Sequence, residues 1–215
     1  MNKNLILESV SDNNVYVYFD DSTRRYCGIV NRLFLDNPDM KYITSYARLK
    51  KHRKTTSVIL NRKLKSVPCY EAWEIVHAAA DRGTGIDLFF EVMSMPDVEH
   101  IMCDRADLSP DAEIAWKKII AFFNEGSTVK LDNYLNPQTP DEIDDCKTWA
   151  EKYGPNNPYD QVIKVPGGTA SSHQHIKLDE LLDHSKLLNA EMAFRHKFEK
   201  GYDEMMIRRG YEPGS

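Results

Sequence analysis

Long apolar runs are missing from this sequence. The first apolar stretch, Leu5-Ile6-Leu7, is followed at once by the charge of Glu8, so it is too short for the core of a signal peptide. No later stretch approaches the roughly 20 apolar residues of a membrane-spanning helix. We therefore expect a soluble, cytoplasmic protein without membrane contact, in the host cytoplasm if the source is viral.

Cysteine is scarce and forms no recognisable pattern. The four cysteines, Cys27, Cys69, Cys103 and Cys146, lie far apart, with no C-x-x-C pair and no histidine at zinc-finger spacing. Disulfides are rare in the cytoplasm. We expect reduced thiols, no metal centre and no cofactor.

Acidic residues are absent between Asp39 and Glu71. The same interval holds nine of the 28 basic residues, whereas all 33 acidic residues lie outside it. The nine cations are Lys41, Arg48, Lys50, Lys51, Arg53, Lys54, Arg62, Lys63 and Lys65. A dense positive segment in an acidic chain attracts polyanions, such as nucleic-acid backbone or an acidic protein surface. These nine residues are the predicted binding site.

Motifs for nucleophilic catalysis and for phosphate loops are also missing. Arg82-Gly83-Thr84-Gly85 lacks the third glycine of a dinucleotide fingerprint and the lysine of a phosphate loop, so we interpret it as the end of a helix. Pro140-Asp141 with Asp145-x-Lys147 imitates a metal-dependent nuclease site. That chemistry requires carboxylates on adjacent strands, and here they fall inside one predicted helix.

Several patterns have the residue types of metal ligands. Glu74-x-x-His77 and Asp97-x-x-His100 have the spacing of helical di-iron sites, with Asp81 on the face of the first pair. Because the predicted helix buries the face of Trp73, exposed pairing is the better interpretation.

Two further groups remain open. His173-Gln174-His175, with Glu180 and His184 downstream, offers zinc-type ligands, but it follows a flexible polar loop. Asp87, Glu91 and Asp97 are acidic neighbours in sequence with nothing to fix their convergence.

Helix starts are marked clearly. Asn37-Pro38-Asp39, Ser109-Pro110-Asp111 and Thr139-Pro140-Asp141 each place a capping side chain, a proline and an acid in helix-start order. They predict helices over 38–52, 110–125 and 140–153. Apolar residues on one face predict another helix from Pro68 to Gly83. A helix of about 30 residues, far above the usual ~11–12, is predicted over Leu178–Arg209, with Gly201 as a candidate break.

Strand signals gather near the N-terminus. Segments 5–10, 15–19 and 24–35 read as a three-stranded antiparallel meander. Residues 86–94 fit either a short helix or a buried strand, and 162–165 fit one more strand. Because a lone small sheet needs a cover, the predicted fold class is α+β. It has a small N-terminal antiparallel meander covered by several helices, and a long C-terminal helix.

Three regions follow from these signals. Residues 1–126 form a predicted α+β core with the basic segment 41–65. Residues 127–175 form a Pro/Gly-rich connecting region with the helix 140–153, and residues 176–215 form the C-terminal long helix. Within the basic segment, residues 55–64 are either a strand or a second helix. The second choice gives a helix-turn-helix outline, in which Ser57, Asn61, Arg62 and Lys65 would reach bases or phosphates.

The leading functional prediction is a non-catalytic nucleic-acid-associated or regulatory accessory protein that binds polyanion through residues 41–65. The alternative is an inhibitor or adaptor that docks on an acidic protein surface, as bacteriophage anti-defence or host-takeover factors do, with the C-terminal helix as a partner or dimer contact. A third class is a metal-dependent hydrolase whose site is assembled from distant residues, since single-sequence reading has no access to convergence in space.

Overall fold

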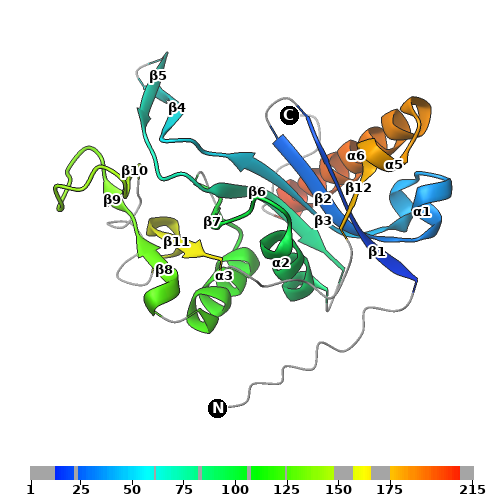
Figure 1. Cartoon of the computed structure of the whole chain (residues 1–215), viewed down its shortest axis with the longest axis horizontal. Coiled ribbons are helices and arrows are strands. Elements are labelled where there is room, and N and C mark those ends of the chain that lie inside the picture. The colour runs from blue at the N-terminus through cyan, green and yellow to red at the C-terminus, as the bar shows by residue number, and fades with distance from the viewer. Residues whose placement is uncertain are drawn as a thin grey trace.

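The computed structural model describes residues 13–21, 24–60, 62–81, 84–105, 108–123, 125–147, 157–165 and 175–208. Within this described part, a mixed sheet of eight strands forms the centre (Figure 1). Its strands lie in the order β12-β1-β2-β3-β6-β7-β11-β8. Their bounds are β1 Asn14–Asp20, β2 Arg24–Asn31, β3 Ile43–Lys51, β6 Trp73–Ala80, β7 His100–Cys103, β8 Thr128–Lys130, β11 Gln161–Lys164 and β12 His175–Lys177.

Two neighbouring pairs in this sheet are parallel, β1 with β12 and β6 with β7. The remaining neighbours are antiparallel. The predicted fold class is therefore corrected: the protein is α+β, but its sheet is large and draws strands from residue 14 to residue 177. The first two strands agree with the predicted meander, whereas segment 5–10 lies outside the described residues. The predicted boundaries at 126 and 175 stay a prediction.

Two predicted helices, 38–52 and 68–83, are strands instead. Their segments became β3 and β6, which lie in the middle of the sheet and pack on both faces. A strand buried on both faces has apolar residues without a period of two, so it imitates one face of a helix. Asp39 does cap a turn, because it accepts a hydrogen bond from the Lys41 amide at 3.0 Å, but that turn is the short 3₁₀ helix η1 (Met40–Tyr42).

The helices of the described residues are α1 Leu33–Asp36, α2 Gly85–Ser94, α3 Pro110–Phe122, α5 Leu178–Leu181 and α6 His184–Arg208, with 3₁₀ turns η2 Glu125–Ser127 and η3 Pro158–Asp160. The predicted start of α3 is confirmed, since Ser109 Oγ accepts a hydrogen bond from the Ala112 amide at 3.2 Å. The open choice over 86–94 is resolved as a helix. The predicted long helix is two helices, α5 and α6, and Gly201 lies inside α6 without breaking it.

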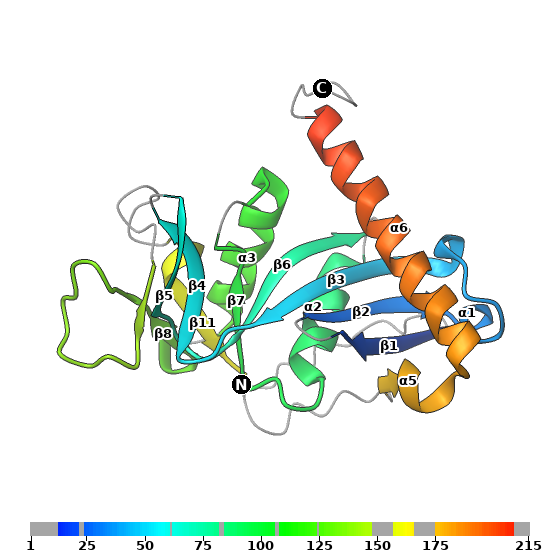
Figure 2. The same ribbon diagram turned by 90° about the horizontal axis from the view of Figure 1, so that it is seen from above.

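Helices cover both faces of the sheet (Figure 2). On one face α2 and α3 pack over β1, β2, β3, β6 and β7 through a cluster that includes Leu88, Phe89 and Trp116. On the other face α6 packs over β1, β2 and β3 through Phe194, which is fully buried against Phe19 and Phe34. Gly28 allows this contact, because a Cβ there would lie 3.0 Å from the Phe194 ring and 2.5 Å from the Ser45 carbonyl oxygen.

Two small strand pairs extend from the main sheet. The first is a hairpin of β4 (Thr55–Leu60) and β5 (Lys63–Pro68), which projects from the body of the molecule in Figure 1. We call this hairpin, residues 55–68, the arm. It replaces the predicted helix-turn-helix alternative. Its two-residue turn contains Arg62 with a positive φ of 60°.

The second small pair is β9 (Asp132–Asn133) with β10 (Asp145–Cys146), which are parallel. The predicted helix 140–153 is wrong over residues 140–147, and its remainder lies outside the described residues. Thr139 does not cap a helix, because its amide and its hydroxyl both donate to Asp132 Oδ2, at 2.8 and 3.1 Å. The sequence Thr139-Pro140-Asp141 therefore belongs to a loop and does not begin a helix.

A disulfide joins Cys69, just after the arm, to Cys146 at the end of β10. The expectation of reduced thiols is therefore wrong for these two residues, whereas Cys27 and Cys103 are free and buried. The partners are 77 positions apart in sequence, and no spacing pattern relates them. Among the described helices, none is both long and apolar enough to cross a membrane.

Candidate functional site

The nine predicted binding cations differ in their surroundings, and their role in binding stays a prediction. Three of them lie against other groups: Lys41 pairs with Asp39 at 3.2 Å, Arg48 is half-buried with its guanidinium 3.8 Å from the Phe198 ring centroid, and Lys51 lies 3.8 Å from Asp97. The interval contains no acid, so these partners come from Asp39 at its edge, from Asp97 between α2 and β7, and from Phe198 of α6.

The other six cations gather around the arm. Lys50 is the last but one residue of β3, Arg53 and Lys54 lie in the link to β4, Arg62 is in the turn, and Lys63 and Lys65 lie on β5. All except the half-buried Lys50 are exposed. Within the described part of the chain, none of the six forms an ion pair. The arm also exposes 74% of Leu64, so its surface carries both charge and one apolar side chain.

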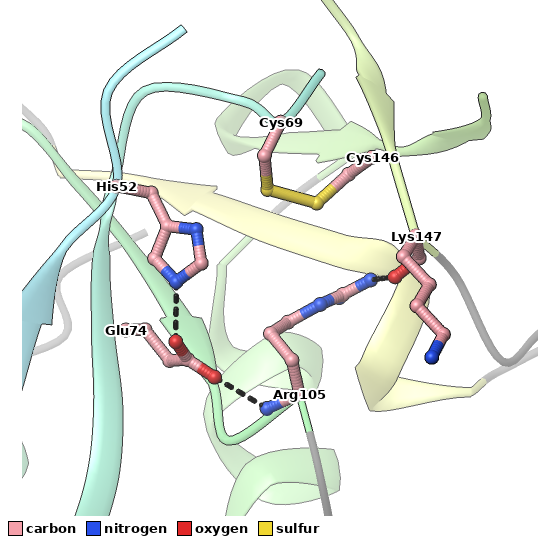
Figure 3. Close-up of a disulfide and its surroundings, with 6 residues drawn as sticks. All are labelled: His52, Cys69, Glu74, Arg105, Cys146 and Lys147. Atoms are coloured by element: carbon pink, nitrogen blue, oxygen red, sulfur yellow. Dashed lines mark hydrogen bonds and ion pairs between the residues drawn. A yellow bond between two sulfur atoms is a disulfide. The ribbon is translucent and has the colours of Figure 1, made fainter. Parts of the chain in front are cut away.

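The root of the arm is held by buried polar contacts (Figure 3). His52, which precedes β4, pairs through Nε2 with Glu74 of β6, and both side chains are almost fully buried. The other Glu74 oxygen accepts a hydrogen bond from the Arg105 amide at 2.6 Å, and the Arg105 side chain donates to the Lys147 carbonyl. Burial raises the pKa of Glu74, but His52 and the Arg105 amide outweigh burial, so the pKa is lowered. This network and the disulfide fix where the arm leaves the sheet.

A different kind of site lies where β6 and β7 separate. The two parallel strands pair only through Trp73↔Ile101, Glu74↔Met102 and Ile75↔Cys103, and beyond Ile75 β6 continues to Ala80 paired with β3 alone. The register between β3 and β6 shifts at this point, since Arg48 pairs with His77 and Leu49 with Ile75. Val76 is therefore the extra residue of a β-bulge, which bends its strand. Figure 2 shows β6 running away from β7 and α3. We call this separation the fork.

A groove with a volume of about 1080 Å³ lies beside the fork. Its floor includes the small side chains of Ala78, Ala79 and Ala80 on β6. One wall comes from the last turns of α6, and the other comes from α2 and the start of α3. The free edge of β6 thus lines a cavity instead of pairing with another described strand.

The backbone of β6 has hydrogen-bonding groups to offer to this groove. In an antiparallel pair, alternate residues direct both the N–H and the C=O toward the partner, and the residues between them direct both groups away. Over 76–80, β6 pairs with β3 on one side only. Its outward groups therefore face the side on which the groove lies, where an extended ligand is able to pair with them.

Two helices begin at the groove, and they differ in how their first turns are satisfied. At α3, Ser109 caps the Ala112 amide, and Pro110 has no N–H to satisfy. At α2, the N-cap residue Thr84 does not cap the first turn, because its hydroxyl instead donates to the Asp81 carbonyl at 2.9 Å. The first amides of a helix carry partial positive charge and favour anions. The start of α2 is thus the better anion site.

Charged and titratable side chains line the groove in balance. Three lysines, Lys41, Lys197 and Lys200, face three acids, Asp81, Asp111 and Glu204. His77 Nε2 lies 3.1 Å from the Tyr46 hydroxyl, which donates to the Lys197 carbonyl at 3.1 Å. Because that hydroxyl proton is used, we assign a proton to His77 Nε2. Burial, and next the charge of Arg48, lower the pKa of His77 to about 4, so its ring is neutral at pH 7.

The predicted di-iron residues do not converge. Glu74 belongs to the arm root, whereas His77 contacts Tyr46 and Phe198. Asp97 pairs with Arg25 at 2.7 Å, and the ring of His100 packs against Tyr70.

The remaining metal patterns fare differently. His175 pairs with Glu91 at 3.0 Å, while His173 lies outside the described residues. Asp145 of the rejected nuclease pattern does join other carboxylates, Asp132 and Asp144.

Sequence reasoning missed the groove, although one signal for it was present. The Arg82-Gly83-Thr84-Gly85 segment was interpreted as the end of a helix, but Thr84 and Gly85 lie at the start of α2, and Arg82 and Gly83 lie outside the described residues. A glycine-rich turn from a strand into a helix is a phosphate-binding arrangement even without the full dinucleotide fingerprint. Comparison with protein-family models, with curated proteins and with solved structures found no match.

Proposed function

We propose that the protein is a group-transfer enzyme that binds a coenzyme A-type acyl donor in the groove at the fork. The observation that carries this proposal is the separation of β6 from β7 at the Val76 bulge, beside the uncapped start of α2. In sheets with parallel neighbours, ligands bind at the carboxyl ends of the strands, where the chain topology opens a crevice. The fork is such a place, since β6 and β7 are parallel and α2 connects them.

The phosphate end of the ligand is expected at α2. Thr84, its N-cap residue, does not cap the first amides, and the preceding sequence is rich in glycine, which lets a ligand approach the backbone closely. The start of α3 lines the same groove. An anion placed here interacts with one helix dipole directly and with a second one nearby.

The middle of the ligand is expected along β6. Ala78, Ala79 and Ala80 leave room above the strand, and the outward backbone groups over 76–80 supply both donors and acceptors. A ligand that pairs with a strand edge must itself be extended and contain amides. A simple nucleotide has no such part.

Coenzyme A combines these two requirements. It carries a diphosphate, followed by an extended chain that contains two amides and ends in a thiol. It serves as a carrier of acyl groups. With the diphosphate at α2, the amide chain of coenzyme A would run back along β6 and bring the thioester toward the fork. A nucleophile of a second substrate would then form a bond to the acyl carbon as the carbon–sulfur bond breaks, and the proton lost by the nucleophile would finish on the released thiol.

Binding calorimetry with coenzyme A, acetyl-coenzyme A and ADP tests this proposal. We expect coenzyme A and acetyl-coenzyme A to bind more tightly than ADP, because only they have the extended amide chain. We further expect Ala80→Glu to weaken coenzyme A binding at least tenfold, equivalent to about 1.4 kcal/mol, since it places a negative charge beside the start of α2. Ala80 is exposed, and its Cβ lies 3.8 Å from the position a Cβ would take on Gly85.

The matched control is Ala80→Gln, which has the same size without the charge and should bind within about threefold of the original protein, less than 1 kcal/mol. Equal loss in both variants would point to crowding instead of phosphate repulsion. Absence of binding by all three ligands would refute the proposal. Equal affinity for ADP and coenzyme A would support the phosphate site at α2 but contradict binding of the amide chain of coenzyme A along β6.

A second candidate function rests on the arm. We infer that the exposed hairpin contacts nucleic-acid backbone through Lys50, Arg53, Lys54, Arg62, Lys63 and Lys65. Two-stranded ribbons fit the major groove of duplex DNA, and this one carries cations without any acid between residues 40 and 70. The buried root would hold such a ribbon in a fixed direction.

The salt dependence of the affinity for duplex DNA tests whether the arm binds nucleic acid. If all six cations meet phosphates of duplex DNA, the log–log slope of affinity against salt would be about −5, from roughly −0.9 per phosphate. Lys63→Glu should weaken binding, whereas Lys118→Glu, an exposed lysine on α3, should not. A flat salt response would exclude this function. Recovery of one acidic protein, lost in Lys63→Glu and free of nucleic acid, would favour the adaptor alternative. A partner contact through α6 stays a prediction.

A further inference from the structure

Three carboxylates meet in the segment that follows β8, on residues that the groove and the arm do not use. Asp132 lies on β9, Asp145 lies on β10, and Asp144 precedes it. One carboxylate oxygen from each of the three lies within 4.8 Å of those of the other two. In the described part of the chain, this is the group of acidic, histidine or cysteine side chains that is close enough to share one ion.

Asp132 is held in one orientation by its own neighbours. Its Oδ1 accepts a hydrogen bond from the Asn133 amide at 2.8 Å, and its Oδ2 accepts from the amides of Gln138 and Thr139 at 2.7 and 2.8 Å. This carboxylate is therefore fixed in orientation.

Asp145 has no such support. It is only 8% exposed, and its buried Oδ1 has no hydrogen-bond partner in the described structure. A buried carboxylate without a donor is costly, and two like charges beside it add to the cost. A positive charge in the middle of the three groups would remove both costs.

The backbone around the group is well fixed. The Asp132 amide donates to the Asp144 carbonyl at 2.8 Å, and the Tyr134 amide donates to the Cys146 carbonyl at 3.2 Å. Cys146 follows Asp145 directly and is bound covalently to Cys69. The backbone that carries the three carboxylates is thus held in place without a bound ligand.

We infer that Asp132, Asp144 and Asp145 bind a hard divalent cation of the calcium class. All three donors are carboxylate oxygens, which hard cations prefer, whereas zinc and copper prefer histidine and cysteine ligands. Cys146 is not available as a thiolate because of its disulfide. Calcium tolerates irregular geometry and takes backbone carbonyls and water to complete its shell, whereas magnesium demands a near-ideal octahedron.

Calorimetric titration of the chelator-treated full chain with CaCl₂ tests the site. We expect one Ca²⁺ per chain, with a Kd on the order of 10⁻⁴ M, and weaker binding of Mg²⁺. Asp145→Asn and Asp144→Asn should each lower the Ca²⁺ affinity at least tenfold. The matched control is Asp203→Asn, an exposed acid on α6, which removes the same charge and should leave the affinity unchanged.

Thermal unfolding provides a second readout. Ca²⁺ should raise the melting temperature of the original protein but not that of Asp145→Asn, because a ligand stabilises only the state that binds it. If Asp145→Asn fails to fold, Asp144→Asn carries the test, since Asp144 is half-buried. No heat and no melting shift at about 10 mM Ca²⁺, above the weak range of such sites, would overturn the inference. So would unchanged affinity in both variants. Coenzyme A binding has no part in either measurement.

Discussion

The groove and the arm are built from opposite materials. The groove is formed by backbone: a strand edge, the first turn of α2, and three alanines that leave both accessible. The second site is formed by side chains, with six cations spread over the approach to β4, the turn of the arm and β5. The first kind of site is defined by which segments lie together, and the second by which residues are present. Counting charges therefore finds the arm and passes over the groove.

The groove and the arm also differ in how tightly their side chains are packed. The wall of the groove belongs to α6, which is fixed to the sheet by Phe194 with no measurable exposure, whereas the arm leaves Leu64 at 74% exposure. Stability should therefore be concentrated in the body of the molecule and at the root of the arm. The tip of the arm should contribute almost none.

The largest effect is expected from Phe194→Ala. The ring packs edge-on against Phe19 and Phe34, with centroids 5.5 and 5.7 Å apart. Removing it leaves a cavity between α6 and the sheet, and we expect a loss of about 4 kcal/mol in the free energy of unfolding, measured by urea titration. A loss below about 1 kcal/mol would mean that α6 is not fixed by this contact.

The next effect concerns the root of the arm. Glu74→Gln should lower the free energy of unfolding by about 3 kcal/mol, because it replaces the carboxylate of a buried pair, which contacts both His52 Nε2 and the Arg105 amide. His52 and Glu74 are 3% and 4% exposed. The control is Glu71→Gln, an exposed acid three positions away, which should change stability by less than about 0.5 kcal/mol. Similar values for the two variants would contradict a buried pair.

A smaller effect should appear with pH at the groove. The pKa of His77 is lowered to about 4, below its ordinary value near 6.5, so the unfolded chain binds the proton first as pH falls. Stability from this residue is thus complete above pH ~6.5 and is lost as pH falls toward ~4, by an amount on the order of 2 kcal/mol after allowance for solvent screening. His77→Gln should flatten the urea midpoint over that window. An unchanged slope would argue against a buried neutral ring.

The smallest effect is expected at the tip of the arm. Leu64→Ser should change the free energy of unfolding by less than about 0.5 kcal/mol, because the side chain has almost no contacts to lose. A loss above 1 kcal/mol, by the same urea titration, would show that the arm packs on something and would weaken the contrast with the groove.

Local signals in the sequence were reliable where one short segment decides its own structure. The capped start at Ser109, the strands around Val15 and Ile29, and the long C-terminal helical region were all predicted. The segments 43–51 and 73–80 were mistaken for helices because they lie in the centre of the sheet. The burial of 43–51 and of 73–75 comes from distant elements, and a window of neighbouring residues does not contain that information.

The candidate sites also differ in how much of each was visible in the sequence. The cations of residues 41–65 were visible as composition, but only the structure separates Lys41, Arg48 and Lys51 from the six around the arm. The groove depends on β6 and β7 being parallel neighbours and on the bulge at Val76, and neither has a local signature. The carboxylate group joins Asp132 to residues more than ten positions away, and the prediction of a helix over 140–153 had placed Asp145 out of reach.

The bridge between Cys69 and Cys146 closes the chain into a ring that contains β6, α2, β7, α3 and β8, and so encloses the fork. A protease that cuts once inside this ring would not release a fragment. The two pieces would migrate together on a denaturing gel and would separate only after a reducing agent opens the bridge. Nicked protein would thus keep the whole groove tethered in one molecule.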